Sequence, residues 1–164
     1  MSSLETRVGE LLHQRGLSLV LAESCTGGLI GDRITDVSGS SEYFLGGFVV
    51  YSYKAKADLL GVSWETLNST GAVSRETVIE MARGARKVLN ADIAVSVSGI
   101  AGPGGGTDEK PVGTTWIGLA TKDEESARVF QFSGDRVQNK SYAADAALQM
   151  LFDYLQSREV ENDV

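Results

Sequence analysis

Two short aliphatic runs constrain the fold more than any other feature of the sequence. Residues 17–22 (LSLVLA) follow a helix that Gly16 ends, and residues 93–98 (IAVSVS) follow a helix that Asn90 ends. Short runs of this kind, apolar at almost every position, are typical of strands buried on both faces of a sheet. A third run, GGFVVYSY at 46–53, is rich in β-branched and aromatic residues and predicts another strand. The chain therefore begins as an alternation of helices and strands, which indicates an α/β fold.

Helical periodicity and capping residues place the helices around these strands. The predicted helices cover 3–15, 29–37, 54–60, 75–89 and about 137–157. Two alternating segments, 114–121 and 127–132, predict an antiparallel hairpin near the end of the chain. We therefore expect one domain over residues 1–164, a three-layer α/β/α sandwich with a mixed sheet, in which 158–164 form a flexible tail.

Charge and residue usage exclude several classes of function. The chain carries 22 acidic against 15 basic residues, and the net charge of -7 argues against strong nucleic-acid binding. It has no run of 18 apolar residues, and its N-terminus lacks a signal peptide, so we expect a cytoplasmic protein without membrane association. Cys25 and His13 are the only residues of their types, which excludes an internal disulfide and a zinc site built on several such ligands. We expect no metal and no cofactor, with catalysis by hydroxyl, lysine or carboxylate side chains.

The segment AESCTGG, residues 22–28, has the composition of a site rather than of a core. It holds an acid, three small side chains that can act as nucleophiles and two glycines, at the point where the first buried strand ends. Ser24 and Thr26 lie near the start of the next helix, where unpaired amides and the helix dipole favour an anion. The alternative is that one of these hydroxyls only caps the helix. The residues alone leave both interpretations open.

A second candidate site is the glycine-dense segment GIAGPGGGTDEKPVG, residues 99–113, which also holds both prolines of the chain. It matches neither a Walker loop nor a dinucleotide-binding fingerprint. Glycine at this density favours a backbone that approaches a ligand or a mobile flap. A long hairpin connection is the alternative.

Polar side chains follow the predicted strands at their carboxyl ends, where ligands bind in open α/β sheets. Without a suitable histidine, the base that can activate a serine is a neutral lysine, assisted by a tyrosine such as Tyr51. Lys56 lies in the first turn of its predicted helix, where the helix dipole disfavours the ammonium form. Lys54 is the alternative base. The two lysines point to opposite sides of the helix, so only one of them can face the site. Backbone amides of the glycine-dense segment or of the turn at Ser24 can stabilise a tetrahedral intermediate. This pattern predicts acyl transfer or amide hydrolysis without metal, and it leaves the attacking serine open.

Several motifs of the chain resemble one known family. They are AESCTGG, GSS at 39–41, GGFVVYSYKAK at 46–56, SVSGIAGPGGGTDEKPVG at 96–113 and SGDR at 133–136. Together, in this order, they resemble the nicotinamide mononucleotide deamidases, the PncC group, which also occurs as the C-terminal domain of CinA proteins. The resemblance covers about residues 5–155 and is closest to the standalone form.

The resemblance implies hydrolysis of the carboxamide of nicotinamide mononucleotide to nicotinate mononucleotide and ammonia, in pyridine nucleotide salvage. By position, Ser41 of GSS resembles the nucleophile, with Lys56 and Tyr51 as its activating pair. The resemblance gives Ser24 and Thr26 a role in orienting the substrate.

The remaining motif positions resemble residues that hold the substrate. Ser98, Gly99 and Gly102 would support the oxyanion or the ligand, and Arg136 of SGDR would meet the phosphate. Lys140 stands where members of the family often carry arginine.

Two further functions stay open at this point. One is a catalytically silent nucleotide-binding domain with a regulatory role in competence or DNA damage. The other, a DNA-binding partner of recombination, fits poorly with the acidic balance. In either case we expect a homodimer or higher homo-oligomer, because Tyr43 and Phe44 are predicted to be exposed aromatic loop residues.

Overall fold

The fold is built on a five-stranded mixed sheet. The computed structural model describes residues 1–162, with side chains up to residue 158. The strands are β1 (Leu19–Glu23), β2 (Phe44–Val49), β3 (Ile93–Gly99), β4 (Thr114–Ala120) and β5 (Glu125–Gln131), in the order β2-β1-β3-β4-β5. Strand β1 runs parallel to β2 and β3, whereas β4 is antiparallel to β3 and to β5. The predicted α/β fold with a mixed sheet is confirmed.

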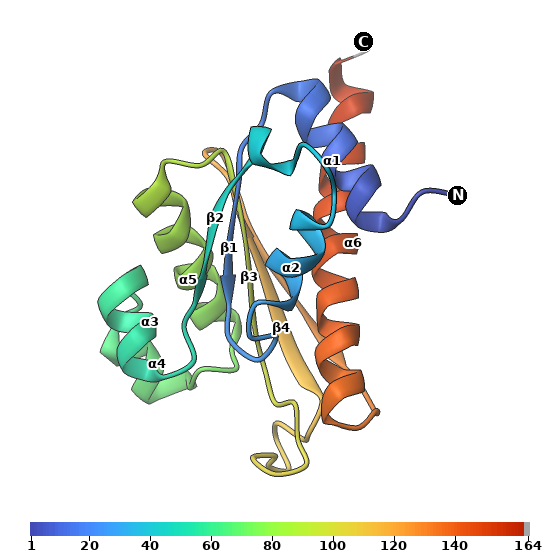
Figure 1. The fold of residues 1–164 in the computed structure, drawn as a ribbon. Helices are drawn as coiled ribbons and strands as arrows, with labels where there is room; N and C mark the ends of the chain where they lie inside the picture. The colour runs from blue at the N-terminus through green and yellow to red at the C-terminus, as the bar shows by residue number, and fades with distance from the viewer. Residues whose placement is uncertain (163–164) are drawn as a thin grey trace.

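Helices cover both faces of this sheet and complete the predicted three layers (Figure 1). The helices are α1 (Leu4–Arg15), α2 (Leu29–Thr35), α3 (Tyr53–Leu60), α4 (Trp64–Thr70), α5 (Arg75–Leu89) and α6 (Arg136–Asn162), and a short 3-10 helix, η1 (Ser40–Glu42), precedes β2. Helices α1, α2 and α6 lie on one face, and α3, α4 and α5 lie on the other. Within residues 1–162, no helix is both long and apolar enough to cross a membrane.

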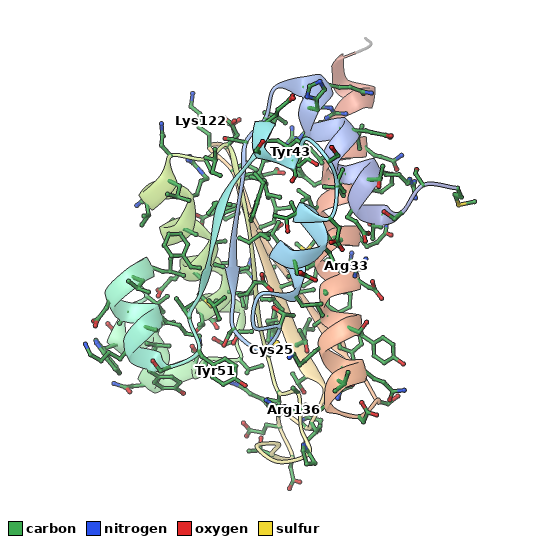
Figure 2. The ribbon with its side chains drawn as sticks, in the orientation of Figure 1. Cys25, Arg33, Tyr43, Tyr51, Lys122 and Arg136 are labelled. Carbon is green, nitrogen blue, oxygen red and sulfur yellow. The ribbon has the colours of Figure 1, made fainter. Side chains whose placement is uncertain are left out.

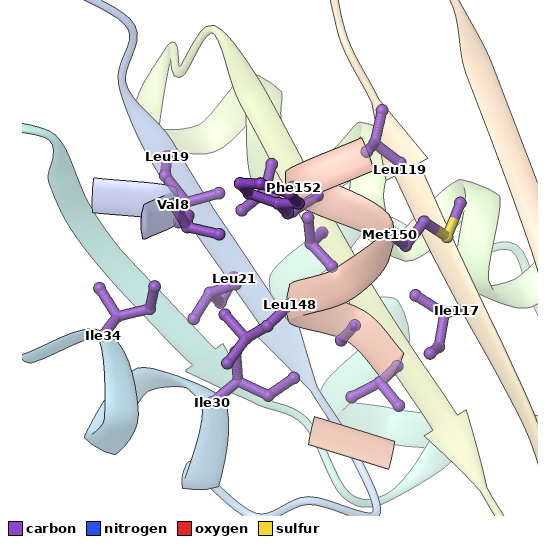
Figure 3. Packing of buried hydrophobic residues seen from close by; sticks show 14 of the residues in the cluster. Val8, Leu19, Leu21, Ile30, Ile34, Ile117, Leu119, Leu148, Met150 and Phe152 are labelled. Atoms are coloured by element: carbon purple, nitrogen blue, oxygen red, sulfur yellow. The ribbon is translucent and has the colours of Figure 1, made fainter. Parts of the chain in front are cut away.

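Strand β1 is buried on both faces, which explains its uninterrupted apolar sequence. Leu19 and Leu21 belong to the core under α1, α2 and α6, where Figure 3 shows Leu19 beside Val8 and Leu21 beside Leu148. Val20 and Ala22 belong to the second core, under α3 and α5. Because successive side chains of a strand point to opposite faces, one five-residue segment contributes to both cores.

Most element boundaries lie within two residues of the prediction, and two differ by more; the first of these two shapes the site. The strand expected over 46–53 lies at 44–49, because the chain leaves the sheet at Val50 and the Ser52 side chain caps α3 by accepting a hydrogen bond from the Ala55 amide. Helix α6 continues to Asn162, so its predicted end near Ser157 is wrong, and residues 163–164 of the expected tail lie outside the described residues.

Gly84 determines how closely α5 approaches α3. A Cβ atom at residue 84 would lie 1.8 Å from the backbone carbonyl oxygen of Leu60. A backbone oxygen at the end of a helix cannot swing away as a flexible side chain can. The missing side chain at Gly84 therefore holds α3 against the sheet and, with it, Lys56.

We expect Gly84→Ala to destabilise the fold by about 2 kcal/mol, as overpacking in a close-packed interior does. In a helix without this contact the same change would be stabilising, by roughly 1 kcal/mol, because alanine has the higher helix propensity. Urea unfolding of the two proteins measures the difference. Gly104→Ala is the control, since a Cβ atom there would meet nothing within 4 Å. Equal or greater stability of Gly84→Ala would contradict the packing argument.

Candidate active site

The pleat of β1 separates two neighbouring polar residues at its carboxyl end. Glu23, like Leu19 and Leu21, belongs to the α2 side, and its carboxylate contacts the start of α2. Ser24 follows Ala22 to the other side and contacts Lys56 of α3. The backbone amide of Ser24 donates to the carbonyl oxygen of Val97 at 3.0 Å, which anchors this turn to the end of β3.

Lys56 is fully buried, at 0 % exposure, and all its recorded polar contacts lie at this end of the sheet. Its Nζ atom donates to Ser24 Oγ at 2.9 Å, to the Val50 carbonyl oxygen at 2.9 Å and to the Tyr51 carbonyl oxygen at 3.2 Å. Both carbonyls belong to the segment where the chain has left β2, so they are free to turn toward the lysine.

These three contacts have a consequence for the neutral amine. A carbonyl oxygen can only accept, so the two carbonyls take two N–H groups of Lys56 in either protonation state. The ammonium form gives its third N–H to Ser24 Oγ. The neutral form instead has a lone pair left for the Ser24 hydroxyl proton. The arrangement can therefore present a lysine base to a serine hydroxyl.

Burial also favours the neutral amine. Removal of Lys56 from water lowers its pKa from 10.5 to about 8, and the nearby Cys25 opposes this only in part. Cys25 itself is buried, and desolvation raises the pKa of its thiol to about 11. The thiol is thus held in its protonated and unreactive form near neutral pH, whereas an appreciable fraction of Lys56 is unprotonated.

The Glu23 carboxylate occupies the helix start that the sequence offered as an anion site. It accepts hydrogen bonds from the Thr26 hydroxyl at 2.6 Å and from the amides of Gly28, Ile30 and Gly31 at 3.0 to 3.2 Å. These donors include first-turn amides of α2, whose N-cap residue is Gly28. Thr26 therefore serves the cap through Glu23, and the structure supports the capping interpretation for it.

Arg136 joins three segments around the same end of the sheet. Its Nη1 atom donates to the Gly102 carbonyl oxygen at 2.7 Å, and its Nη2 atom donates to the Tyr51 hydroxyl at 3.0 Å. Figure 2 shows Tyr51 and Arg136 at this end, near Cys25. Residue 102 requires glycine, since its φ is +89° and a Cβ atom would lie 2.5 Å from the Val112 side chain. The glycine-dense segment is thus held close to the site, next to a pocket of about 510 Å³ beside Arg136.

Ser98 and Gly99 end β3 beside the turn that carries Ser24. The parallel register pairs Glu23 with Val97, so Ser24 and Ser98 are neighbours on the same face, roughly 5 Å apart as adjacent strands are. Ser98 is buried at 1 % exposure. The predicted grouping of Ser24, Lys56, Ser98 and Gly99 at one edge is therefore found.

Ser41 is not part of this group. It lies in η1, before β2 begins, and the neighbouring Tyr43 carbonyl accepts a hydrogen bond from the amide of Leu19 at the start of β1. Because β1 and β2 are parallel, this is the opposite end of the sheet, a strand length of roughly 17 Å from Ser24. Figure 2 shows Tyr43 and Tyr51 at these two ends. The expected relay of Ser41, Tyr51 and Lys56 is not formed within this chain, and the Tyr51 hydroxyl contacts Arg136 instead of the lysine.

The structure also shows where Lys54 and Lys140 lie relative to the site. Lys54 is exposed and forms an ion pair with Asp58 on the surface of α3, so it does not compete with Lys56. Lys140 of α6 lies near the turn, with its Nζ 4.0 Å from the place of a Cβ atom on Gly27. Two aromatic expectations were wrong: Tyr43 is buried at 4 % exposure and Phe44 packs partly against the core.

Sequence reasoning missed one residue that positions the site. Asn139 is buried on α6; its side-chain amide donates to the Ala101 carbonyl at 3.1 Å and its side-chain oxygen accepts from the Gly134 amide at 2.9 Å. It thereby ties the glycine-dense segment to the start of α6. An asparagine on a helix face gives no such signal in the sequence. In the part of the chain that the structure describes, no three histidine, cysteine or carboxylate side chains are grouped as metal ligands would be.

Comparisons with known proteins agree on one family. A family model described as the CinA C-terminal domain matches residues 1–155. The nicotinamide-nucleotide amidohydrolase PncC of Escherichia coli K12 is 51 % identical over 153 residues, which cover 93 % of each chain. A CinA-like protein of Chloroherpeton thalassium is 52 % identical over 156 residues, but this chain spans only 37 % of its length.

Solved structures show the same fold. A crystal structure of a CinA superfamily protein from Klebsiella pneumoniae superposes with a TM-score of 0.91 at 36 % identity and covers 94 % of this chain and 96 % of that one. The protein CihA of Agrobacterium tumefaciens gives a TM-score of 0.87 at 39 % identity, with 95 % and 99 % covered.

The lowered pKa of Lys56 makes stability depend on pH. Between pH 8 and pH 10.5 the unfolded chain keeps the lysine proton and the folded chain has lost it, so rising pH favours folding. Relative to Lys56→Met, the wild type should gain about 3 kcal/mol of unfolding free energy across this interval. Urea unfolding at several pH values measures it.

Lys54→Met is the matched control, because Lys54 is exposed on the same helix. Its stability difference from the wild type should stay nearly constant over the same pH interval. A constant difference for Lys56→Met as well would contradict the lowered pKa.

Proposed function

The chain belongs to the CinA C-terminal domain family, and from this premise we propose that it is a serine amidohydrolase that converts nicotinamide mononucleotide to nicotinate mononucleotide and ammonia. The observation that carries the proposal is the buried Lys56 amine, 2.9 Å from the Ser24 hydroxyl and fixed by two carbonyl oxygens. The PncC relative, named for nicotinamide-nucleotide amidohydrolysis, supports the choice of substrate.

In the proposed reaction, Ser24 is the nucleophile and Lys56 is the base. Neutral Lys56 takes the hydroxyl proton as Ser24 Oγ attacks the carboxamide carbon and forms a tetrahedral intermediate. The lysine ammonium then gives this proton to the amide nitrogen. Ammonia departs, and an acyl-serine ester remains. Water, deprotonated by the same lysine, attacks the ester carbon, and Ser24 recovers its proton from the ammonium. This assignment replaces Ser41 by Ser24, because Ser24 Oγ lies 2.9 Å from Lys56 Nζ whereas Ser41 lies at the opposite end of the sheet.

The neighbouring residues fit the rest of the substrate. Ser98 and Gly99 end the adjacent strand, where the Ser98 hydroxyl is the donor proposed for the oxyanion. Arg136 is exposed, and its guanidinium is a bidentate donor that suits a phosphate, which would replace the Gly102 and Tyr51 oxygens as acceptors. We place the reaction in cytoplasmic pyridine nucleotide salvage.

Two substitutions test the catalytic pair. Ser24→Ala and Lys56→Met should each lower kcat for ammonia release from nicotinamide mononucleotide by at least about 10³-fold, because each removes one half of the proton transfer. Lys54→Met should keep the wild-type rate. Circular dichroism of every variant verifies folding. Ammonia release at the wild-type rate by either of the first two variants would overturn the mechanism, and a folded wild type that binds the nucleotide without releasing ammonia would overturn the activity.

The proposed phosphate contact is tested by pairing two substrates. Arg136→Met should raise KM for nicotinamide mononucleotide by roughly 10- to 100-fold, the effect of losing a charge-assisted hydrogen bond. It should leave kcat/KM for nicotinamide riboside, which lacks the phosphate, within about threefold of the wild-type value. An equal loss with both substrates would mean that Arg136 acts through its Gly102 and Tyr51 contacts rather than on the phosphate.

A further inference from the structure

The nucleophile and the base of the proposed reaction are closed off from solvent. Ser24 is 7 % exposed, Lys56 is 0 % exposed and Ser98 is 1 % exposed. A carboxamide carbon has to come within roughly 3 to 3.5 Å of the Ser24 hydroxyl oxygen before that oxygen can attack it. The site therefore has to open before a substrate can reach the serine.

A bridge of hydrogen bonds crosses the end of the sheet at which Ser24 lies. Tyr51 follows β2 and Gly102 follows β3, and Arg136 donates to both of them, at 3.0 Å and 2.7 Å. In the sheet, β1 lies between β2 and β3, and the three parallel strands end on the same side. The bridge formed by Tyr51, Arg136 and Gly102 therefore passes over the carboxyl end of β1, which Ser24 follows.

Gly102 belongs to a weakly held segment, residues 101–110, which we call the strap. Residues 103–109 of the strap are all exposed. A pocket of about 510 Å³ lies between the strap and the start of α6, and another of about 460 Å³ lies between the strap, the end of α4 and the start of α5. A segment with so little buried contact opens at a low cost in free energy.

Helices hold the strap by hydrogen bonds near its two ends. At its start, Asn139 and Arg136 of α6 donate to the carbonyl oxygens of Ala101 and Gly102. At its end, the Lys110 ammonium donates to the carbonyl oxygen of the last residue of α4. Of these three donors, Arg136 is the one that also forms the bridge. Loss of its contacts would therefore loosen the strap and break the bridge together.

From this arrangement we infer that the bridge is a gate over Ser24 and that a phosphate group opens it. The inference rests on the proposed function, in which the substrate phosphate binds Arg136. A phosphate accepts stronger, charge-assisted hydrogen bonds from a guanidinium than a neutral carbonyl or phenol oxygen does. Its binding takes the two Nη atoms away from Gly102 and Tyr51. The start of the strap is then released, the exposed Tyr51 side chain turns away, and the path to Ser24 opens.

The gate gives the phosphate a second role in the choice of substrate. A nucleotide brings the group that opens the site, whereas a nucleoside depends on spontaneous opening. The bonds that break are two hydrogen bonds from an exposed guanidinium, and such bonds contribute little net free energy. We therefore expect phosphate to increase access to Ser24 by about threefold.

Electron paramagnetic resonance of a spin label on the strap tests the gate without reference to catalysis. The label is attached at Gly104→Cys, because a Cβ atom there would meet nothing within 4 Å. The control label is at Lys122→Cys, in the turn between β4 and β5 at the other end of the sheet (Figure 2). Inorganic phosphate should raise the mobility of the label at residue 104 and leave the label at residue 122 unchanged. Sodium chloride at the same ionic strength should change neither.

Two variants separate the gate from phosphate binding. Arg136→Met should give the mobile spectrum at residue 104 without phosphate, and phosphate should not change it further. Lys110→Met should loosen the other end of the strap but keep the response to phosphate. A wild-type spectrum that phosphate leaves unchanged, or an Arg136→Met spectrum as immobile as that of the wild type, would overturn the inference.

Sulfonylation of Ser24 by phenylmethanesulfonyl fluoride, a neutral reagent for activated serines, tests whether the gate controls the path to the nucleophile. By mass spectrometry, phosphate should speed the modification of Ser24 about threefold in the wild type. In Arg136→Met the rate should be the faster one with or without phosphate. Equal wild-type rates under both conditions would count against the gate. A Ser24 that is never modified, in protein that releases no ammonia, would instead reject the proposed function, and the spin-label result would still decide the gate.

Discussion

The functional end of the molecule depends on keeping the Lys56 amine away from water. Burying an ammonium group costs several kcal/mol unless it is paired or well hydrogen-bonded, and among the side chains and backbone that the structure describes, the acceptors bonded to Lys56 Nζ are neutral oxygens. Two of these, the carbonyls of Val50 and Tyr51, are available because β2 ends at Val49. The early end of the strand and the close approach of α3 to α5 at Gly84 therefore serve the same purpose, since together they bring the amine to acceptors that a longer strand would have used in the sheet.

The pleat of β1 explains how a buried carboxylate and a lysine of lowered pKa coexist so close together. A carboxylate paired with Lys56 would favour the ammonium form and raise its pKa. Glu23 is instead directed to the opposite face, where donors at the start of α2, together with Thr26, satisfy it. Ser24, one residue later, contacts the lysine. Because successive side chains of a strand alternate between its faces, the Glu23 carboxylate and the Ser24 hydroxyl lie on opposite sides of the sheet. The charge that caps α2 is thereby kept away from the serine that contacts Lys56.

Much of the fold could be predicted from the sequence, because apolar periodicity and capping residues act locally. The predicted helix over 75–89, the buried strand β3 and the final hairpin are confirmed, and in the structure Ser74 caps that helix. The end of β2 was not predicted, because Val50 and Tyr51 continue a strand-like composition, whereas in the structure Ser52 caps α3 and the Val50 and Tyr51 carbonyls accept hydrogen bonds from Lys56. The contact between Ser24 and Lys56 could not be predicted either, because it depends on how β1, β2 and α3 pack in three dimensions. The sequence does show that Ser41 precedes its strand, but only the parallel register of β1 and β2 shows that this position lies at the end of the sheet away from Lys56.

Parallel pairing imposes a general limit that bears on Ser41. In β1 and β2 the carboxyl ends lie together, so any segment that precedes one of these strands is a strand length from any side chain that follows it. No rearrangement of side chains crosses that distance within one chain. A serine before β2 therefore cannot reach the Lys56 amine of its own chain, whereas Ser24, which follows β1 at the carboxyl end, lies 2.9 Å from it.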